Sequence, residues 1–460
     1  MTLTLSAPTE TAPDRLAGLP VAIIGAGPVG LAAAAHLSRR GLPFVVFEAG
    51  ESAGSAIALW GHTRLFSPWR YVIDEAARGL LAAQGWTSPD PEVLPRGRDL
   101  VADYLEPLAA TPQLAPHIRY SANVSAVSRQ GMDRTRSTGR ADAPFVLRVE
   151  QNGNVRDELA RAVIDTSGTY RNPNGLLASG LDPVDLDALR PHLSHALPDV
   201  LGRDRARFAG RRTLVLGAGH SAANTLIALA GLARQQPGTE VVWGIRNAGP
   251  KRVYTGADDE LQDRAALGDR VACLVAEGRI TLLDSFEVDR VELAGGAVRV
   301  DGRRAGEPVS IETDVIVGAT GFKPDLDMLR EIRLALDDIV EAPSALAPLI
   351  DPNLHSCGTV PPHGVAELAQ PEPNFFVAGM KSYGRAPTFL LLTGYEQVRS
   401  IADELAGDHA AARRVRLTLP ETGVCSGGEG SACCSTPSTS APARRPLQLL
   451  TVRPSRGGGC

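Results

Sequence analysis

Features of several protein classes are missing from the 460-residue sequence. It contains no stretch of about 18 uncharged apolar residues, which argues against a membrane-spanning helix. The N-terminal segment has no basic stretch followed by an apolar run, so no secretory signal is expected, and we predict a cytoplasmic protein with reduced thiols. The 47 basic and 52 acidic side chains give a formal net charge of −5, which argues against a nucleic-acid or anionic-membrane partner.

Paired cysteines are missing from the body of the chain, which holds Cys273 and Cys357 far apart in the sequence. A dithiol redox centre needs two sulfur atoms within reach of each other. Neither a CxxC nor a CxxxxC pair occurs, so the body of the chain does not predict such a centre. The other four cysteines follow residue 424: Cys425, Cys433, Cys434 and Cys460.

A strand, a glycine turn, a helix and a second strand follow one another near the N-terminus. The apolar run 19–24 leads into GAGPVG at 25–30, and the alanine-rich stretch 31–40 favours a helix. A second apolar run, 43–47, ends at Glu48. This order is typical of a dinucleotide-binding βαβ unit.

Each residue of this first unit has a physical task. Gly25 permits a tight turn, and Gly27 lets the backbone approach a pyrophosphate. Gly30 lets the helix pack closely on the strand, and Pro28, in the same turn, is counted among the expected cofactor contacts. Glu48 is placed to accept hydrogen bonds from ribose hydroxyls, so we predict an FAD-like site here.

A second copy of the pattern begins at the strand expected over 211–216. It continues with GAGHSA at 217–222, a helix over 223–234 and a strand over 240–246. This strand ends in Arg246, which suits the 2′-phosphate of NADPH, whereas a carboxylate would repel it. A solvated charge is the alternative reading of Arg246, and Lys251 or Arg252 would then take the phosphate. The contacts predicted for NADPH are Gly217, Gly219, His220, Ser221, Ala222 and Arg246.

Two such units in one chain predict an α/β protein with two Rossmann-like domains, the NADPH domain being inserted into the FAD domain. The segments 161–168 and 312–322 are apolar strands that end in Ser/Thr-Gly, and we expect both to return to the first domain. There Gly168, Thr320 and Gly321 would let the chain pass close to a cofactor. The expected division is a disordered arm (1–18), FAD-binding segments (19–205 and 313–410), an NADPH domain (206–312) and a low-complexity tail (411–460).

The two glycine turns, Glu48 and ATGF at 319–322 resemble those of the two-dinucleotide-domain flavoproteins, specifically their flavin-containing and N-hydroxylating monooxygenase branch. The resemblance covers about residues 19–405 and implies FAD and NADPH as cofactors. It implies a small-molecule substrate and molecular oxygen as partners. The FxGxxxH fingerprint of the branch is not found in 193–203, ahead of the second turn. In overall character the chain also resembles flavoproteins of actinobacterial arsenic-resistance gene clusters.

The resemblance further assigns residues around the flavin. Trp60 lies in a segment similar to the branch's Gly-Gly-x-Trp region and would pack beside the isoalloxazine. His62 and Arg70 follow on the side expected for the substrate. Core packing is the alternative for Trp60, and a structural hydrogen bond is the alternative for His62. Val124 is also expected to contact FAD.

A third strand is expected over 374–380, where the branch places its last flavin contacts. Gly379 and Met380 stand where the branch usually has Gly-Asp, so backbone groups are expected to contact the cofactor. Lys381 would neutralise the reduced flavin or bind an anionic substrate, and a solvated loop charge is its alternative.

No metal site is predicted, because His355, Cys357 and His363 do not provide the four closely spaced ligands that zinc prefers. The segment 421–460 is rich in Gly, Ser, Thr and Pro and lacks apolar periodicity, so we expect it not to fold alone. Its vicinal cysteines, Cys433 and Cys434, suit a thiophilic ligand or a thiol relay to the flavin, or they are incidental.

These patterns predict an FAD-dependent, NADPH-using monooxygenase that oxygenates a sulfur, nitrogen or metalloid centre through a flavin hydroperoxide. One alternative is a reductase that passes electrons to the tail thiols or to an arsenical. Another is a metalloid-binding thiol module on a flavoprotein body. A homo-oligomer is compatible with the sequence.

Overall fold

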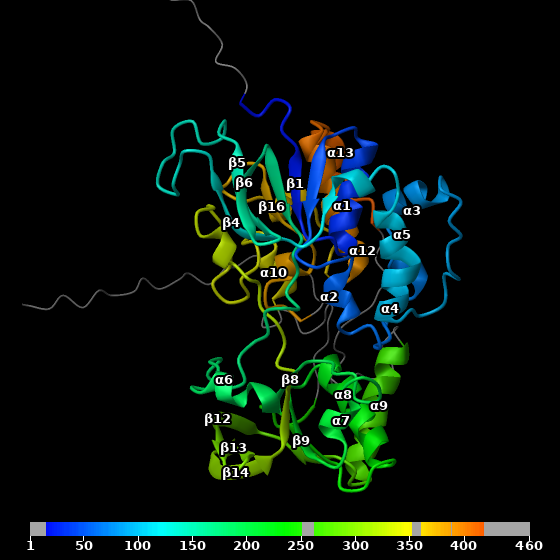
Figure 1. Ribbon diagram of the computed structural model, residues 1–460, viewed down its shortest axis with the longest axis vertical. Coiled ribbons are helices and arrows are strands. Elements are labelled where there is room, and N and C mark those ends of the chain that lie inside the picture. Colours follow the sequence, from blue (N-terminus) through cyan, green and yellow to red (C-terminus); the bar gives the residue numbers. More distant parts are fainter. Residues whose placement is uncertain (1–14, 251–261, 352–359, 388, 418–460) are drawn as a thin grey trace, which may run out of the picture. The chain divides into compact units, whose positions relative to one another are not determined.

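The computed structural model describes residues 15–250, 262–351, 360–387 and 389–417. Each of the two glycine turns belongs to a parallel five-stranded sheet. Each of these sheets is accompanied by a three-stranded antiparallel sheet (Figure 1). The predicted α/β class with two Rossmann-like units is confirmed. The tail cysteines and Cys357 lie outside the described residues.

The first parallel sheet has the strand order β16-β7-β1-β2-β3. Its central strands β1 and β7 are buried throughout, which suits their continuous apolar sequences. Its strands are β1 (Val21–Ile24), β2 (Phe44–Phe47), β3 (Ile118–Arg119), β7 (Ala162–Asp165) and β16 (Phe375–Val377).

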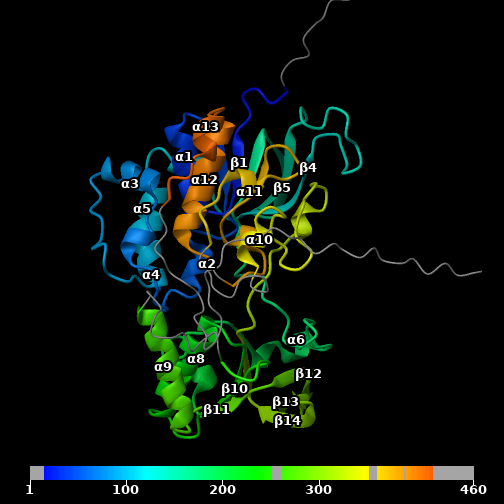
Figure 2. The same ribbon diagram turned by 180° about the vertical axis from the view of Figure 1, so that it is seen from behind.

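Helix α1 (Pro28–Arg39) follows β1 and is almost entirely buried, because α12 (Leu391–Leu405) and α3 (Glu75–Ala82) pack against it. The short side chains of four consecutive alanines, 32–35, allow these close contacts. On the reverse side, α11 (Val365–Leu368) and α13 (His409–Arg413) pack against α12 (Figure 2). Shorter helices complete this lobe: α2 (Ser55–Ala58), η1 (Trp69–Tyr71), α4 (Gly97–Leu100), η2 (Val101–Leu105), α5 (Glu106–Ala109), η3 (Ala115–His117), η5 (Asp327–Leu329), α10 (Ala347–Ile350) and η6 (Gly379–Tyr383).

The second parallel sheet has the order β11-β10-β9-β15-β8. Its strands all lie between β7 and β16 in the sequence, so this unit is inserted into the first. They are β8 (Leu193–His195), β9 (Arg212–Leu216), β10 (Glu240–Gly244), β11 (Thr281–Leu283) and β15 (Val315–Gly318). The helices of this unit are α6 (Leu186–Leu189), η4 (Arg190–His192), α7 (Arg205–Phe208), α8 (His220–Ala233) and α9 (Gln262–Ala276).

Strand β15 corrects one expectation about the connection between the two units. We expected 312–322 to return to the first sheet, but β15 pairs with β9 and β8 of the second sheet. The second unit therefore extends from α6 to β15, beyond the boundaries predicted at 206 and 312. A short apolar strand that is followed by glycine fits either parallel sheet, because the central strands of both sheets are buried on both faces.

In the sequence, the strands of each antiparallel sheet lie between two strands of one parallel sheet. One contains β4 (Ala122–Arg129), β5 (Phe145–Gln151) and β6 (Asn154–Ala160). The other contains β12 (Phe286–Ala294), β13 (Ala297–Arg304) and β14 (Glu307–Thr313). None of the described helices has the length and apolar character needed to cross a membrane.

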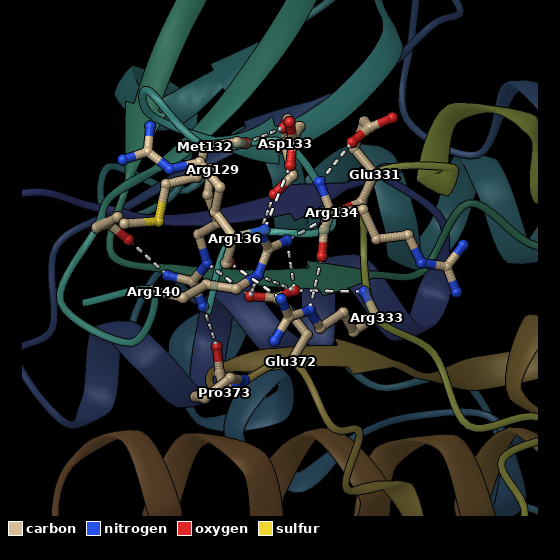
Figure 3. Close-up of polar contacts among 12 residues, drawn as sticks. Arg129, Met132, Asp133, Arg134, Arg136, Arg140, Glu331, Arg333, Glu372 and Pro373 are labelled. Carbon is tan, nitrogen blue, oxygen red and sulfur yellow. Dashed lines mark hydrogen bonds and ion pairs between the residues drawn. The ribbon is translucent and has the colours of Figure 1, made fainter. Parts of the chain in front are cut away.

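A buried carboxylate holds the polar loop 130–144 between β4 and β5 (Figure 3). Glu372 accepts a hydrogen bond from Nε of Arg129 at 2.8 Å and one from Nε of Arg140 at 2.9 Å. The Arg129 and Glu372 side chains are both 0% exposed. The backbone N–H of Arg333 also donates to this carboxylate, at 3.3 Å. The loop is thus anchored to a segment more than 200 residues away in the sequence.

Candidate functional site

Two glycines of the first turn are required by the protein itself. Gly25 has φ +100°, a conformation that side chains disfavour, and a Cβ there would lie 3.0 Å from the carbonyl oxygen of Thr166. A Cβ on Gly30 would lie 2.0 Å from the carbonyl oxygen of Gly25. These glycines therefore serve the turn and the close packing of α1 on β1, as predicted from the sequence.

Gly27 is different, because the protein alone does not require a glycine there. Its φ is −79°, and a Cβ at this position would meet no atom within 4 Å. No side chain caps the N-terminus of α1. The open space lies at a helix N-terminus with unsatisfied N–H groups, the geometry that suits a pyrophosphate. Helix α1 begins at Pro28, ahead of the helix expected over 31–40.

Glu48 lies beside this turn at the end of β2. Its carboxylate accepts hydrogen bonds from the backbone N–H of Ala26 at 2.7 Å and of Gly50 at 2.8 Å. These contacts fix the carboxylate next to the open space, and each oxygen has a second lone pair for a ribose hydroxyl. Val124 lies on β4 and is buried at 7% exposure against the first sheet.

In the second turn, too, the protein itself requires one glycine and leaves open space at another. Gly217 has φ +130°, and a Cβ there would lie 2.0 Å from the carbonyl oxygen of Ala319. Gly219 has φ −109°, and its Cβ would meet no atom within 4 Å. Ala222 replaces the third glycine and is fully buried. The second turn therefore also leaves open space at a helix N-terminus, where His220 and Ser221 begin α8.

Arg246 follows β10, at the same edge of the second sheet. Its side chain is exposed and forms no ion pair with any other residue that the structure describes. A free guanidinium at this edge is available to a phosphate group. Lys251 and Arg252, the alternatives for this role, lie outside the described residues.

Thr320 and Gly321 follow a strand of the second sheet and not, as expected, a strand of the first, and their contact with a cofactor stays a prediction. They follow β15 and form a ribbon with 172–174. The Thr320 hydroxyl donates to the carbonyl oxygen of Asn174 at 3.0 Å, and the Asn174 amide donates back to that of Thr320 at 3.1 Å. Gly168, after β7, has φ +72° and open space where a Cβ would be.

Trp60 is half-buried and packs against the backbone of Gly97, where a Cβ would come within 2.8 Å of the indole ring. Tyr170 lies 6.5 Å from the indole between ring centroids, and it contacts the rings of His195 at 4.6 Å and Phe322 at 5.3 Å. Burial raises the pKa of Tyr170 to about 12. This aromatic cluster was not predicted from the sequence, because its members come from four separate segments.

His62, Arg70 and Lys381 each interact with a different partner. Burial lowers the pKa of His62, which also interacts with the backbone of Pro198. Arg70 is exposed and forms an ion pair with Glu92.

Lys381 is not a solvated loop charge. It is buried, and its Nζ lies 2.6 Å from Oδ2 of Asp165. Asp165 ends β7 and was not identified from the sequence, although its position at a strand end next to Thr-Ser-Gly was a usable signal. Met380 precedes this lysine and is half-buried.

The turn that contains Gly379 is held by a buried polar chain. The backbone N–H of Gly379 donates to Oε1 of Gln397 at 2.8 Å, and Nε2 of Gln397 lies 2.8 Å from Nε2 of His363. Burial lowers the pKa of His363, which favours the neutral ring that accepts this hydrogen bond. Within the described residues no cluster of metal-ligating side chains occurs, and His363 serves this chain.

Comparisons with known proteins match this geometry. The family model described as "Pyridine nucleotide-disulphide oxidoreductase" matches residues 22–344. A putative flavin-containing monooxygenase of Arabidopsis thaliana is 29% identical over 202 residues, which are 39% of this chain and 42% of that protein. The chain thus spans about two fifths of the length of this curated relative.

Solved structures share the fold. The bacillithiol disulfide reductase from Bacillus cereus has a TM-score of 0.62 at 19% identity, over 85% of this chain and 99% of that one. An FAD-bound cadaverine monooxygenase of desferrioxamine biosynthesis from Erwinia amylovora has a TM-score of 0.58 at 15% identity, over 88% and 98%. The resemblance to the monooxygenase branch of these flavoproteins is therefore confirmed, whereas the link to arsenic-resistance clusters stays a prediction.

Proposed function

Since the chain belongs to the pyridine nucleotide-disulphide oxidoreductase family, we propose that it is an FAD-dependent, NADPH-using monooxygenase of a small molecule. Its substrate offers a sulfur, nitrogen or metalloid centre to be oxygenated by molecular oxygen. FAD supplies the electron-transfer and oxygen chemistry when bound, and the protein binds, orients and shields it.

The proposal rests on a difference between the glycines of both turns: contacts within the protein explain some of them and not others. Gly25, Gly30 and Gly217 are explained by contacts within the protein, whereas Gly27 and Gly219 are not. A glycine without an internal reason, at an uncapped helix N-terminus, points to a ligand that the backbone must approach. Two such positions in two parallel sheets support two dinucleotides.

The two strand ends support different coenzymes. Glu48 is held where it can accept hydrogen bonds from ribose hydroxyls, which suits FAD. Arg246 is an exposed cation at the matching position of the second unit, which suits the 2′-phosphate of NADPH. Cofactor roles for Val124, Gly168, His220, Ser221, Gly379 and Met380 remain part of this proposal.

The cysteines favour oxygenation over disulfide reduction. Cys273, on α9, is the one free cysteine among the described residues, and it is exposed. A dithiol relay needs a second sulfur atom within bonding distance. Trp60 and the Tyr170 cluster instead provide aromatic surface for an organic substrate, with His62 and Arg70 in the same segment as Trp60.

Flavin content of purified Gly27→Val tests the proposal. The structure has room for this side chain, so the variant is expected to fold, but the side chain fills the space assigned to the pyrophosphate. We expect the variant to purify nearly colourless, with an unchanged circular-dichroism spectrum. Gly79→Val is the matched control, because Gly79 also has open space but lies on the exposed side of α3. Full flavin occupancy in Gly27→Val would remove the basis of the FAD assignment.

A further inference from the structure

A buried ion pair joins two turns at the carboxyl edge of the first sheet. Nζ of Lys381 lies 2.6 Å from Oδ2 of Asp165, and both side chains are 0% exposed. Asp165 is the last residue of β7, and Lys381 follows β16, the strand that pairs with β7. Because removing two charges from water is costly, such a pair contributes little stability relative to apolar packing. Its hydrogen bonds, in contrast, define the orientation of both turns.

Ser167 and Thr166 connect the pair to the first glycine turn. Ser167 donates to Oδ1 of Asp165 from its backbone N–H at 3.1 Å and from its hydroxyl at 2.7 Å. Lys381 donates to the Ser167 hydroxyl at 3.1 Å. Thr166 donates from Oγ1 to the carbonyl oxygen of Ile24, at 2.8 Å, directly ahead of Gly25.

The other turn lies against the beginning of α1. A Cβ on Gly379 would meet the side chain of Val29 at 3.3 Å, so the Gly379 backbone lies close to this side chain. Val29 lies in the first turn of α1, next to the open space at Gly27. The turns linked by the ion pair therefore contact the chain before and after Gly27, the glycine assigned to the pyrophosphate.

We propose that Lys381 and Asp165 are positioning residues that hold these two turns in the geometry that binds FAD. This inference rests on the proposed function. The Asp165 carboxylate neutralises the charge of Lys381. The Lys381 ammonium group donates hydrogen bonds to Asp165 and to Ser167. It therefore acts on the cofactor through the turns, and an anionic substrate is not its partner.

Release of FAD from the full-length holoprotein separates this role from a purely structural one. The dissociation constant is obtained by dilution, read as the return of flavin fluorescence, well below the unfolding temperature. Lys381→Met and Asp165→Asn each leave one buried charge without its partner. We expect the dissociation constant to rise by about ten- to a hundredfold, the range seen when groups that orient metal ligands are removed.

Two further variants sharpen the test. Asp165→Asn combined with Lys381→Gln restores a hydrogen bond between uncharged amides, and we expect it to recover most of the lost affinity. Ser167→Ala removes single hydrogen bonds and no charge, so it is expected to fold and to weaken FAD binding by about fivefold. Arg148→Met is the control, because Arg148 and Asp157 form an exposed pair on β5 and β6; its FAD affinity should be unchanged.

The outcomes distinguish the explanations. An unchanged dissociation constant in Ser167→Ala and in the charge variants, with a lower unfolding midpoint, would overturn the proposal, because the pair would then hold only the fold. A double variant as weak as Lys381→Met would also overturn it, since the lysine would then contact FAD directly. Wild-type protein that binds no FAD would refute the proposed function instead.

Discussion

Loss of the Glu372 carboxylate is expected to destabilise the first lobe strongly. In Glu372→Ala the guanidinium groups of Arg129 and Arg140 lose the carboxylate between them, and the Arg129 side chain has no exposed surface through which water could replace it. Burial lowers the pKa of Arg129, and Glu372 counteracts this effect. Removing one partner of a buried pair costs about 3–5 kcal/mol, because a charge stays buried without compensation. We expect the free energy of unfolding, from urea titrations followed by circular dichroism, to fall by about this amount.

Arg330→Ala is the control for this experiment, because Arg330 and Asp327 form an ion pair with side chains 79% and 82% exposed. Its free energy of unfolding should change by less than about 1 kcal/mol. A loss in Glu372→Ala as small as that of the control would refute the reasoning, since it would mean that water solvates the guanidinium groups in the folded protein.

Because of the same carboxylate, we expect the free energy of unfolding to fall at acidic pH. Burial alone would raise the pKa of Glu372, but hydrogen bonds from Arg140 and Arg129 outweigh it and lower the pKa below its ordinary value of 4.5. A lowered pKa in the folded state gives stability that is present above 4.5 and is lost as the pH falls through the folded value. Glu372→Gln should therefore lose less stability than the wild type as the pH falls below 4.5.

Three other predictions follow from the sites. Arg246→Ala should lower the preference for NADPH over NADH in kcat/KM by about ten- to a hundredfold, the value of a lost arginine–phosphate contact; an unchanged ratio would assign the phosphate elsewhere. Because burial lowers the pKa of His363 below 6.5, its contribution to stability should decline as the pH falls below 6.5, and His363→Gln should flatten this part of the urea-midpoint profile; an identical profile would contradict the neutral-ring assignment. Deletion of 421–460 should leave both flavin reduction by NADPH and substrate turnover intact, and loss of turnover alone would favour a thiol relay through the tail.

Local patterns in the sequence were sufficient for the two dinucleotide turns. A strand, a turn and a helix that are adjacent in the chain depend on φ preferences, helix capping and apolar runs, all of which are local properties. The expected helix 31–40 and strand 43–47 correspond closely to α1 and β2 for this reason. The residues Glu48 and Arg246 could be singled out because Glu48 follows β2 directly and Arg246 lies two residues after β10.

Sheet membership required the tertiary structure. The segments 161–168 and 312–322 have the same pattern, yet β7 pairs with β1 and β15 pairs with β9. Both strands are buried on both faces, so their side chains carry no information about which sheet they join. Loop closure and the packing of the neighbouring helices decide it.

The amino-acid sequence by itself determined the fold class, the order of the two dinucleotide units and the residues of their turns. The tertiary structure decided which glycines the protein itself needs, because that depends on atoms such as the carbonyl oxygens of Thr166 and Ala319. It also decided that Lys381 is buried with Asp165, 216 residues away in the sequence. A charged residue after a strand is usually solvated, and only the partner brought to it by the fold makes its burial favourable.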